Sequence, residues 1–159
     1  AARPALGKST LAVNMARNAA IHGAVVGIFS LEMSRDQLAL RLLSSEASVD
    51  AHRLRLGLYT DTEGGRIMSA VGGLSDLAIY IDDSPLQTVT EMRSKARRLF
   101  TERGADLIIV DYLQLIRGTG NRNENRVLEL GEITRSLKGL LAILWDVCPC
   151  HEYRALFLE

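Results

Sequence analysis

Three residues near the start of the chain have the types and the spacing that bind phosphate. Gly7, Lys8 and Ser9 lie in the run Ala5-Leu6-Gly7-Lys8-Ser9-Thr10, which leads directly into residues with helical spacing. Backbone N–H groups at a helix start can hold an anion, the helix dipole favours it, and a lysine adds positive charge. A serine hydroxyl here can join a magnesium shell. The sequence therefore indicates a phosphate-binding loop.

The triplet alone is a weak signal. In the pattern G-x-x-x-x-G-K-S/T the first glycine falls at position 2, where this chain has Ala2. An exposed helix start with a surface lysine is the alternative interpretation. The residues that follow favour the phosphate loop, because they alternate between apolar strands and helices.

A carboxylate after an apolar run supplies a metal-binding group for such a loop. Asp111 directly follows the β-branched and apolar run Leu107-Ile108-Ile109-Val110, and an acid there can hold magnesium through water. Asp82 and Asp83 follow a similar run. Spacing favours Asp111 but does not exclude the other two.

A second carboxylate, Glu32, follows the apolar run at 24–31. Phosphoryl transfer to water needs a group that orients the water, and Glu32 is a candidate. Its alternative role is that of an acid near the helix start at Ser34, where the dipole favours negative charge. Ligands of open α/β sheets gather at the carboxyl ends of strands, so the loop and the acids are expected at one edge.

The elements that position these residues alternate between two periods. Apolar strands separated by helices predict an α/β fold with a parallel sheet buried on both faces. Pairs such as Ser34 with Gln37 and Thr88 with Glu91 mark helix starts. The expected strands are 24–31, 77–83 and 107–110, and the expected helices are 8–22, 34 onward, 50–74 with a break near Gly57, 88–104, and a last one near 130–140.

Composition limits the class of protein. Apolar residues make up 47% and charged residues 24% of 159 residues, which is typical of one globular domain. No apolar run is long enough for a membrane span. Two close cysteines, Cys148 and Cys150, cannot staple a fold, so a cytoplasmic protein is expected. Basic and acidic residues balance at 19 each, so any nucleic-acid binding must come from a local patch.

Several runs together resemble one family. The phosphate loop with alanine at position 2, the run Ser30-Leu31-Glu32-Met33-Ser34 and the run Asp111-Tyr112-Leu113-Gln114-Leu115 resemble motifs of the DnaB-type replicative DNA helicases. Residues 124–126 and 132–138 resemble the helix that follows in that family. The resemblance runs in order from residue 1 to about 140. It implies a RecA-like P-loop NTPase core.

The resemblance also implies roles for individual residues. Glu32 becomes the catalytic glutamate, and Lys8 contacts the β- and γ-phosphates. The cofactors implied are ATP and Mg²⁺. The residues that would bind them are Gly7, Lys8, Ser9, Thr10 and Asp111, with Ser9 and Asp111 at the metal.

Membership of this family implies partners as well. A ring of six copies translocates on single-stranded DNA, and the polar loop at 117–126 corresponds to a loop in the central channel. Arg117, Arg122 and Arg126 are its candidate DNA-binding residues, and a solvated surface turn is the alternative. The implied activity is ATP-dependent unwinding of DNA at replication forks.

Departures from the family pattern set the expected boundaries. The strand that enters the phosphate loop is missing before Ala1, and the resemblance stops after Leu140, so a core truncated at both ends is expected. We divide the chain into a partial ATPase domain at 1–140 and a patternless tail outside the family at 141–159. Out-of-frame coding would yield such a tail. A metal site at Cys148, Cys150 and His151 is the alternative, and it lacks a fourth ligand.

Two other functions remain open at this point. The chain alone is expected to be weak or inactive, so a non-catalytic remnant or partner-binding fragment that keeps the fold is one alternative. A recombinase-type RecA relative is another, and the run 30–34 argues against it.

Overall fold

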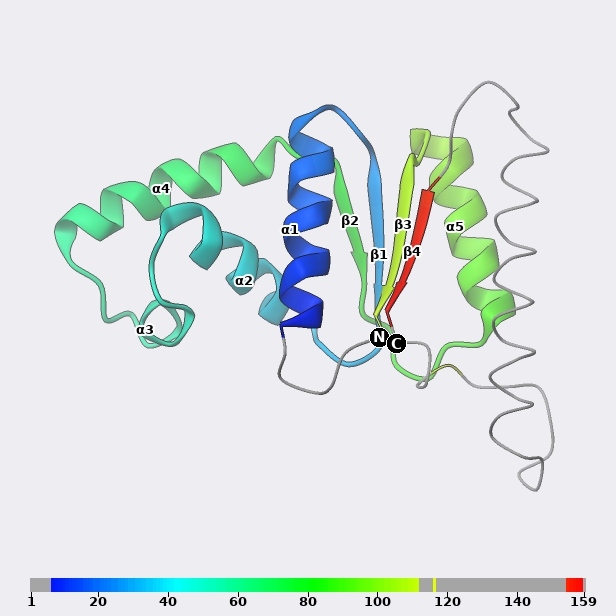
Figure 1. Ribbon diagram of the computed structural model, residues 1–159, viewed down its shortest axis with the longest axis horizontal. Helices are drawn as coiled ribbons and strands as arrows, with labels where there is room; N and C mark the ends of the chain where they lie inside the picture. Colours follow the sequence, from blue (N-terminus) through cyan, green and yellow to red (C-terminus); the bar gives the residue numbers. More distant parts are fainter. Residues whose placement is uncertain (1–6, 112–115, 117–153, 159) are drawn as a thin grey trace.

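A computed structural model of the chain describes residues 7–111, residue 116 and, as backbone, residues 154–158. Within these residues, four parallel strands form one sheet: β1 (Val26–Ser30), β2 (Ile79–Asp82), β3 (Leu107–Asp111) and β4 (Arg154–Leu158). Their order is β2-β1-β3-β4 (Figure 1), so β1 lies between β2 and β3. The expected helix near 130–140 lies outside the described residues.

The pairing register brings the carboxyl ends of neighbouring strands together. Phe29 pairs with Asp82 on one side of β1, and Ser30 pairs with Asp111 on the other side. Because all pairs are parallel, the carboxyl ends of β1, β2 and β3 meet at one edge, as the sequence predicted.

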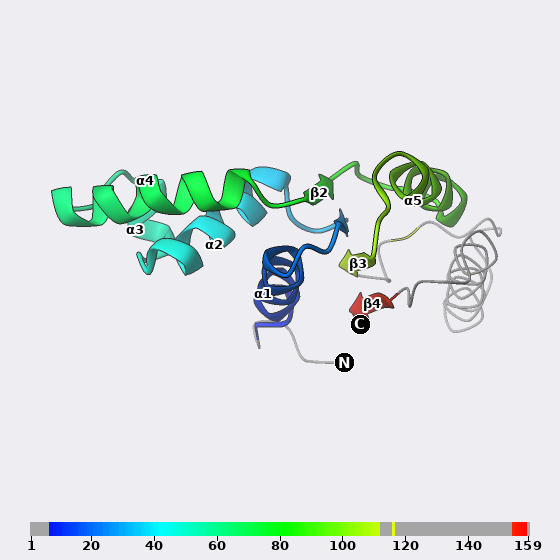
Figure 2. The same ribbon diagram turned by 90° about the horizontal axis from the view of Figure 1, so that it is seen from above.

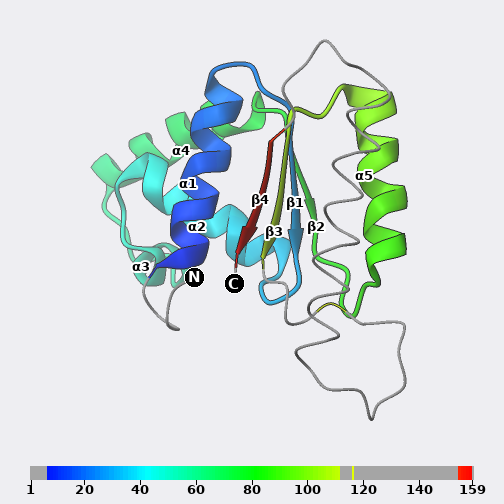
Figure 3. The same ribbon diagram turned by 45° about the vertical axis from the view of Figure 1, so that its right-hand side comes forward.

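Helices cover both faces of this sheet, which confirms the predicted α/β fold. Helix α1 (Lys8–Ile21) packs on one face and α5 (Val89–Arg103) on the other (Figure 3). Alternate strand residues serve the two cores, because side chains along a strand point to opposite faces. Val26, Ile28 and Ile109 face α1, whereas Phe29, Ile108 and Val110 face α5.

Three further helices form a lobe beside the sheet (Figure 2): α2 (Arg35–Ala47), α3 (Ala51–Arg55) and α4 (Asp61–Ser75). Leu38 and Leu42 of α2 still belong to the core beneath α1. A small separate core of Ala47, Val49, Ile67 and Ala70 joins α2 to α4. The predicted break near Gly57 is confirmed, since α3 ends at Arg55 and α4 begins at Asp61.

Local helix signals in the sequence are confirmed. Capping boxes close the starts of α2, α4 and α5 at Ser34, Thr60 and Thr88. Each box joins a hydroxyl to the N–H three residues on, and a Glu or Gln returns the bond. Gly104 ends α5 with φ 71°, a conformation that glycine adopts without strain.

Strand β4 is a feature that the sequence did not predict. It lies within the segment 141–159 and pairs with β3 from Leu107↔Arg154 to Asp111↔Leu158. A run of five residues carries little periodicity, and only pairing with β3 identifies it as a strand. The parallel sheet thus extends beyond β3.

Candidate functional site

The start of α1 differs from the starts of the other long helices. Gly7 is its N-cap with φ 80°, and no side-chain cap hydrogen bond closes this helix start among the described residues. The first turn of α1 contains no acid either. N–H groups at a helix start need partners, and an anion can supply them. This helix start can therefore accept a phosphate group.

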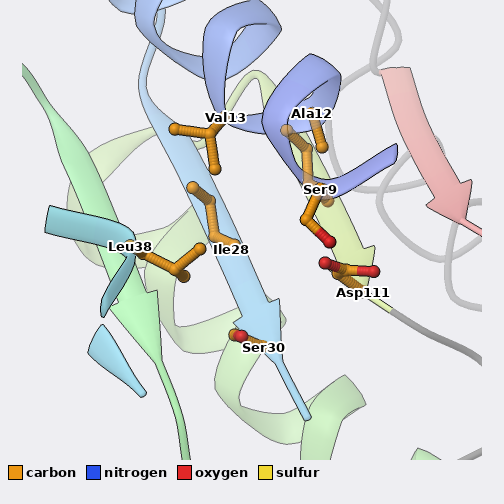
Figure 4. Close-up of a pocket in the computed structure, with 8 residues that line it drawn as sticks. Ser9, Ala12, Val13, Ile28, Ser30, Leu38 and Asp111 are labelled. Carbon is orange, nitrogen blue, oxygen red and sulfur yellow. The ribbon is translucent and has the colours of Figure 1, made fainter. Parts of the chain in front are cut away.

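Ser9 and Asp111 face each other beside this helix start. Figure 4 shows the Ser9 hydroxyl and the Asp111 carboxylate directed toward one another. They line one narrow pocket with Ala12, Val13 and Ile28, and the pocket has no room for a water molecule. Apolar side chains make up most of the rest of the pocket lining.

Asp111 is the acid that fits a metal ion. Its side chain is 3% exposed, and its Oδ1 has no hydrogen-bond partner among the described residues. A buried carboxylate oxygen without a partner is unfavourable unless a cation or donor reaches it. The described residues contain no group of three His, Cys, Asp or Glu that could enclose a metal by themselves. A magnesium ion that also takes nucleotide phosphates and water needs only one or two protein ligands.

Asp82 has structural partners instead. Its carboxylate forms an ion pair with Lys95 and accepts hydrogen bonds from Ser84 N at 3.0 Å and Gln87 Nε2 at 3.1 Å. Burial raises the pKa of Asp82, but the bonds from Lys95 and Ser84 outweigh it and leave that pKa below the ordinary value. A carboxylate occupied in this way is a poor metal ligand.

Asp83 is also engaged. Its Oδ2 accepts a hydrogen bond of 2.9 Å from the backbone N–H of Arg35, at the start of α2. Of the three acids that spacing left open, Asp111 alone presents an unpaired buried oxygen among the described residues. The structure therefore favours Asp111 for the metal-binding role.

Glu32 lies in the turn between β1 and α2, at the same edge of the sheet, and its side chain is exposed. The backbone N–H of Leu31 donates to the carbonyl of Asp111 at 2.8 Å. The Ser30 hydroxyl donates to the Met33 carbonyl at 2.7 Å and accepts from Met33 N at 3.3 Å. These bonds hold the Glu32 turn beside Asp111.

The remaining predicted site residues are placed as follows. Lys8 is the first residue of α1 and is half-buried, and the hydroxyl of Thr10 accepts a hydrogen bond of 2.9 Å from Arg41 Nη1. Gly7, Lys8 and Ser9 thus share the helix start that faces Asp111. Arg117, Arg122 and Arg126 lie outside the described residues, as do Cys148, Cys150 and His151.

The sequence did not identify the residues whose hydrogen bonds hold the turns at the carboxyl edge of the sheet. Ser30 and Gln87 are buried polar residues, each no more than 3% exposed, and both form side-chain hydrogen bonds within the strand-end turns. A polar residue in or after an apolar run was the available signal. Their partners lie only three to five residues away in the sequence, but the bonds depend on the exact conformation of the two turns, which a run of residue types does not specify.

Comparisons with known proteins agree with this geometry. Residues 1–146 match the model of the family described as DnaB-like helicase C terminal domain. The chain is 48% identical to the Replicative DNA helicase DnaB of Geobacillus stearothermophilus over 141 residues, which are 88% of the chain and 31% of that protein. It is 50% identical to the Replicative DNA helicase DnaB of a Nostoc species, over 88% of the chain and 16% of that protein.

Solved structures show the same likeness. One solved structure is described as "The Structure Of A DnaB-Like Replicative Helicase And Its Interactions With Primase". It superposes on this chain with a TM-score of 0.85 at 26% identity, and the match covers 98% of this chain and 36% of the solved chain. A second solved structure, described as an ATPase domain, superposes with a TM-score of 0.85 at 27% identity, over 98% of this chain and 54% of that chain. The chain thus spans about a third of the length of the Geobacillus relative.

A parallel sheet with a Gly-Lys-Ser helix start and an acid at the neighbouring strand end defines a RecA-like α/β domain. Within that class, the chain belongs to the family of DnaB-like helicase C-terminal domains. Among the described residues, no helix is long and apolar enough to cross a membrane.

Proposed function

We propose that this chain is the ATP-driven motor domain of a replicative DNA helicase. One observation carries the proposal: the Ser9 hydroxyl faces the buried carboxylate of Asp111, whose Oδ1 has no partner among the described residues, at a helix start without a side-chain cap. Membership of the DnaB-like family supports it. The substrate is ATP with Mg²⁺, and its hydrolysis would drive movement along DNA.

The phosphate-binding residues act by position and charge. Gly7 is the left-handed N-cap of α1, and the N–H groups of the first turn, which no side chain caps, would bind the phosphates. Lys8 contributes the positive charge next to the β- and γ-phosphates. Ser9 and Asp111 would hold Mg²⁺, which neutralises charge on the phosphates when bound. Thr10, in the first turn of α1, would be the last residue of this phosphate-binding set, and its hydroxyl accepts a hydrogen bond from Arg41.

Glu32 is the residue that we assign to the attacking water. Its exposed carboxylate projects from a turn whose backbone is bonded to Asp111, so it lies on the same edge as the metal-binding residues. A carboxylate there would orient the water and accept its proton as the water oxygen bonds to the γ-phosphorus, while the bond from that phosphorus to the bridging oxygen breaks and ADP leaves.

We further propose that six copies form a ring around single-stranded DNA. Arg117, Arg122 and Arg126 would contact its phosphates, because the loop that contains them carries one acid, Glu124. The solved DnaB-like helicase that interacts with primase makes primase a candidate partner of the whole protein.

The test is the substitution Glu32→Gln in a full-length helicase that carries this domain. An amide hydrogen-bonds water but does not accept its proton, so ATP hydrolysis should fall by about 100-fold or more. ATP binding, measured by calorimetry, should stay within a few-fold of wild type. DNA unwinding should be lost together with hydrolysis.

A matched control is Glu102→Gln, which removes an exposed acid of α5 that pairs with Arg98. It should leave hydrolysis unchanged. If Glu32→Gln keeps turnover within a few-fold of wild type, Glu32 is only an acid near a helix start, and the proposed catalytic role is wrong.

A further inference from the structure

The Glu32 carboxylate makes no hydrogen bond with any of the described residues. Its position therefore depends on the backbone of the turn between Ser30 and Arg35. A group that must orient one water has to be held closely in place, because misplacement by about 1 Å can lower a rate roughly 100-fold. The bonds that hold this turn are thus relevant to catalysis.

One side of the turn is fixed by β3. Ser30 pairs with Asp111 in the sheet, and the next N–H, that of Leu31, still donates to the Asp111 carbonyl at 2.8 Å. Asp111 therefore directs its carboxylate toward Ser9, while its backbone carbonyl accepts a hydrogen bond from the turn that carries Glu32.

The other side of the turn is fixed from β2. Asp83 follows the last residue of β2, and its Oδ2 accepts a hydrogen bond of 2.9 Å from Arg35 N, three residues after Glu32. Because β1 lies between β2 and β3, the turn is held from both neighbouring strands. Asp82, next to Asp83, is in turn fixed by Lys95 of α5.

Capping of α2 does not require Asp83. The Ser34 hydroxyl already accepts from Gln37 N at 3.3 Å, and the Gln37 side chain accepts from Ser34 N at 3.1 Å. Asp83 adds a bond from a residue 48 positions away. Its distinguishing property is that it joins the end of β2 to the turn that carries Glu32.

We infer that Asp83 is a positioning residue for ATP hydrolysis: it holds the Glu32 turn through Arg35 N and so sets where Glu32 places the water. The inference rests on the proposed function of Glu32. Asp83 acts on the turn and not on the nucleotide, so its loss affects turnover more than ATP affinity.

The experiment uses Asp83→Ala in the full-length helicase. Hydrolysis (kcat) should fall by about 10- to 100-fold, whereas the Kd for ATP stays within about two-fold of wild type. Asp83→Asn keeps an acceptor oxygen for Arg35 N and should restore most of kcat. The control Asp50→Ala removes the equivalent bond at α3, from Arg53 N at 3.0 Å, and should leave kcat unchanged.

A double substitution separates positioning from a loss of stability. Residues that act as a unit are not additive, so Asp83→Ala should cause no further loss of kcat in a Glu32→Gln background. The inference is overturned if Asp83→Ala keeps full kcat, if Asn rescues nothing, or if the two losses multiply. Failure of Glu32→Gln alone to lower kcat would instead refute the proposed function.

Discussion

The burial of Asp111 suits its proposed metal-binding role but lowers the stability of the folded chain. Its buried Oδ1 has no partner among the described residues, and such a group typically costs about 1–3 kcal/mol of folding stability. The Ser9 hydroxyl opposite it does not offset that loss by a hydrogen bond to Oδ1. The arrangement is reasonable if a cation occupies the space between nucleotide and carboxylate.

We therefore predict opposite effects of Asp111→Asn on binding and stability. Removal of the buried charge should raise the free energy of unfolding by about 1 kcal/mol. Magnesium-dependent ATP affinity should fall at least about 10-fold, because a neutral amide is a weak magnesium ligand. Calorimetry with and without Mg²⁺, together with urea unfolding, measures both.

The control for this prediction is Asp106→Asn, next to the opposite end of the same strand, where the carboxylate accepts from Val25 N at 2.8 Å. It should leave magnesium-dependent binding unchanged. Equal ATP affinity in Asp111→Asn and wild type would refute a metal-binding role for Asp111.

Leu86 is a second residue in an unusual state. It is 59% exposed and has φ 59°, in the left-handed region that costs an L-residue about 1–2 kcal/mol. Leu86→Gly removes that strain but adds entropy to the unfolded chain, which offsets about 0.4–1 kcal/mol. The expected net result is a gain of about 0.5 kcal/mol in stability.

Leu58→Gly is the matched control, since Leu58 is also 59% exposed but does not have a positive φ. It should lower stability in the same thermal or urea unfolding measurement. A loss of stability in both variants would show that the conformation of Leu86 is not strained.

At the scale of elements, local chemistry was predictable and long-range pairing was not. The boxes at Ser34, Thr60 and Thr88 were visible because both partners lie within three residues. Asp111 was favoured from its own strand. The hydrogen bond that Arg35 N donates to Asp83 was not predictable, because it requires β2 to lie beside β1.

Packing between α5 and the sheet depends on the absence of a side chain at Gly27. A Cβ there would lie 2.8 Å from both Leu99 Cδ2 and Ile108 Cδ1. Both contacts are flexible side-chain ends, so Gly27→Ala should lower stability by only about 1 kcal/mol, and Gly27→Val by up to about 3 kcal/mol. Urea unfolding of the two variants checks this order.

Gly72→Ala, within α4, provides the opposite expectation. A Cβ there meets no atom within 4 Å, and Ala is the better helix former, so stability should rise by about 0.5–1 kcal/mol. If Gly27→Ala were also stabilising, the packing of α5 against this strand would not require a residue without a side chain at position 27.

An ion pair joins α3 to α4, and its contribution to folding stability should depend on pH. Arg53 donates two hydrogen bonds of 2.9 Å to Glu63, and Thr60 N donates a third of 2.8 Å. The bonds from Arg53, followed by the bond from Thr60, lower the pKa of Glu63 to about 2 from an ordinary value of 4.5. Glu63 thus stabilises the folded state fully above its ordinary pKa.

This contribution should disappear as the pH falls from about 4.5 to about 2, because the unfolded state then binds the proton first. Glu63→Gln and Arg53→Met should each make the loss of stability over that range shallower than in wild type. Urea unfolding at a series of pH values measures the slope. An unchanged slope in both variants would contradict the assignment to this pair.

At the scale of the whole molecule, charge is balanced while the functional groups are gathered. Lys+Arg and Asp+Glu number 19 each, so the net charge of the chain supplies no overall attraction for a polyanion. The candidate phosphate-binding residues and the acidic residues meet at one sheet edge because the strands are parallel. Under the proposed function, DNA binding would come from a local patch that the proposed ring repeats across several copies.

The isolated chain should therefore bind single-stranded DNA weakly. The loop with Arg117, Arg122 and Arg126 offers about two or three phosphate contacts, so binding is expected near ~0.1 mM or weaker at physiological salt, with a salt slope of about −2. A ring presents several such loops to one strand, which raises the effective concentration without new contacts. Triple substitution of the arginines should reduce even this weak binding.

Fluorescence anisotropy with labelled single-stranded DNA tests the expectation, and sedimentation in the same buffer reports the number of copies in the complex. Low-micromolar binding by a sedimenting monomer would place the DNA site elsewhere on the chain, and the proposed role of the loop would be wrong. Low-micromolar binding that appears only together with a ring, and with a salt slope several times steeper, would instead support the multivalent account. The salt slope is informative because it counts phosphate contacts: a single loop cannot release as many counterions as six loops on one strand.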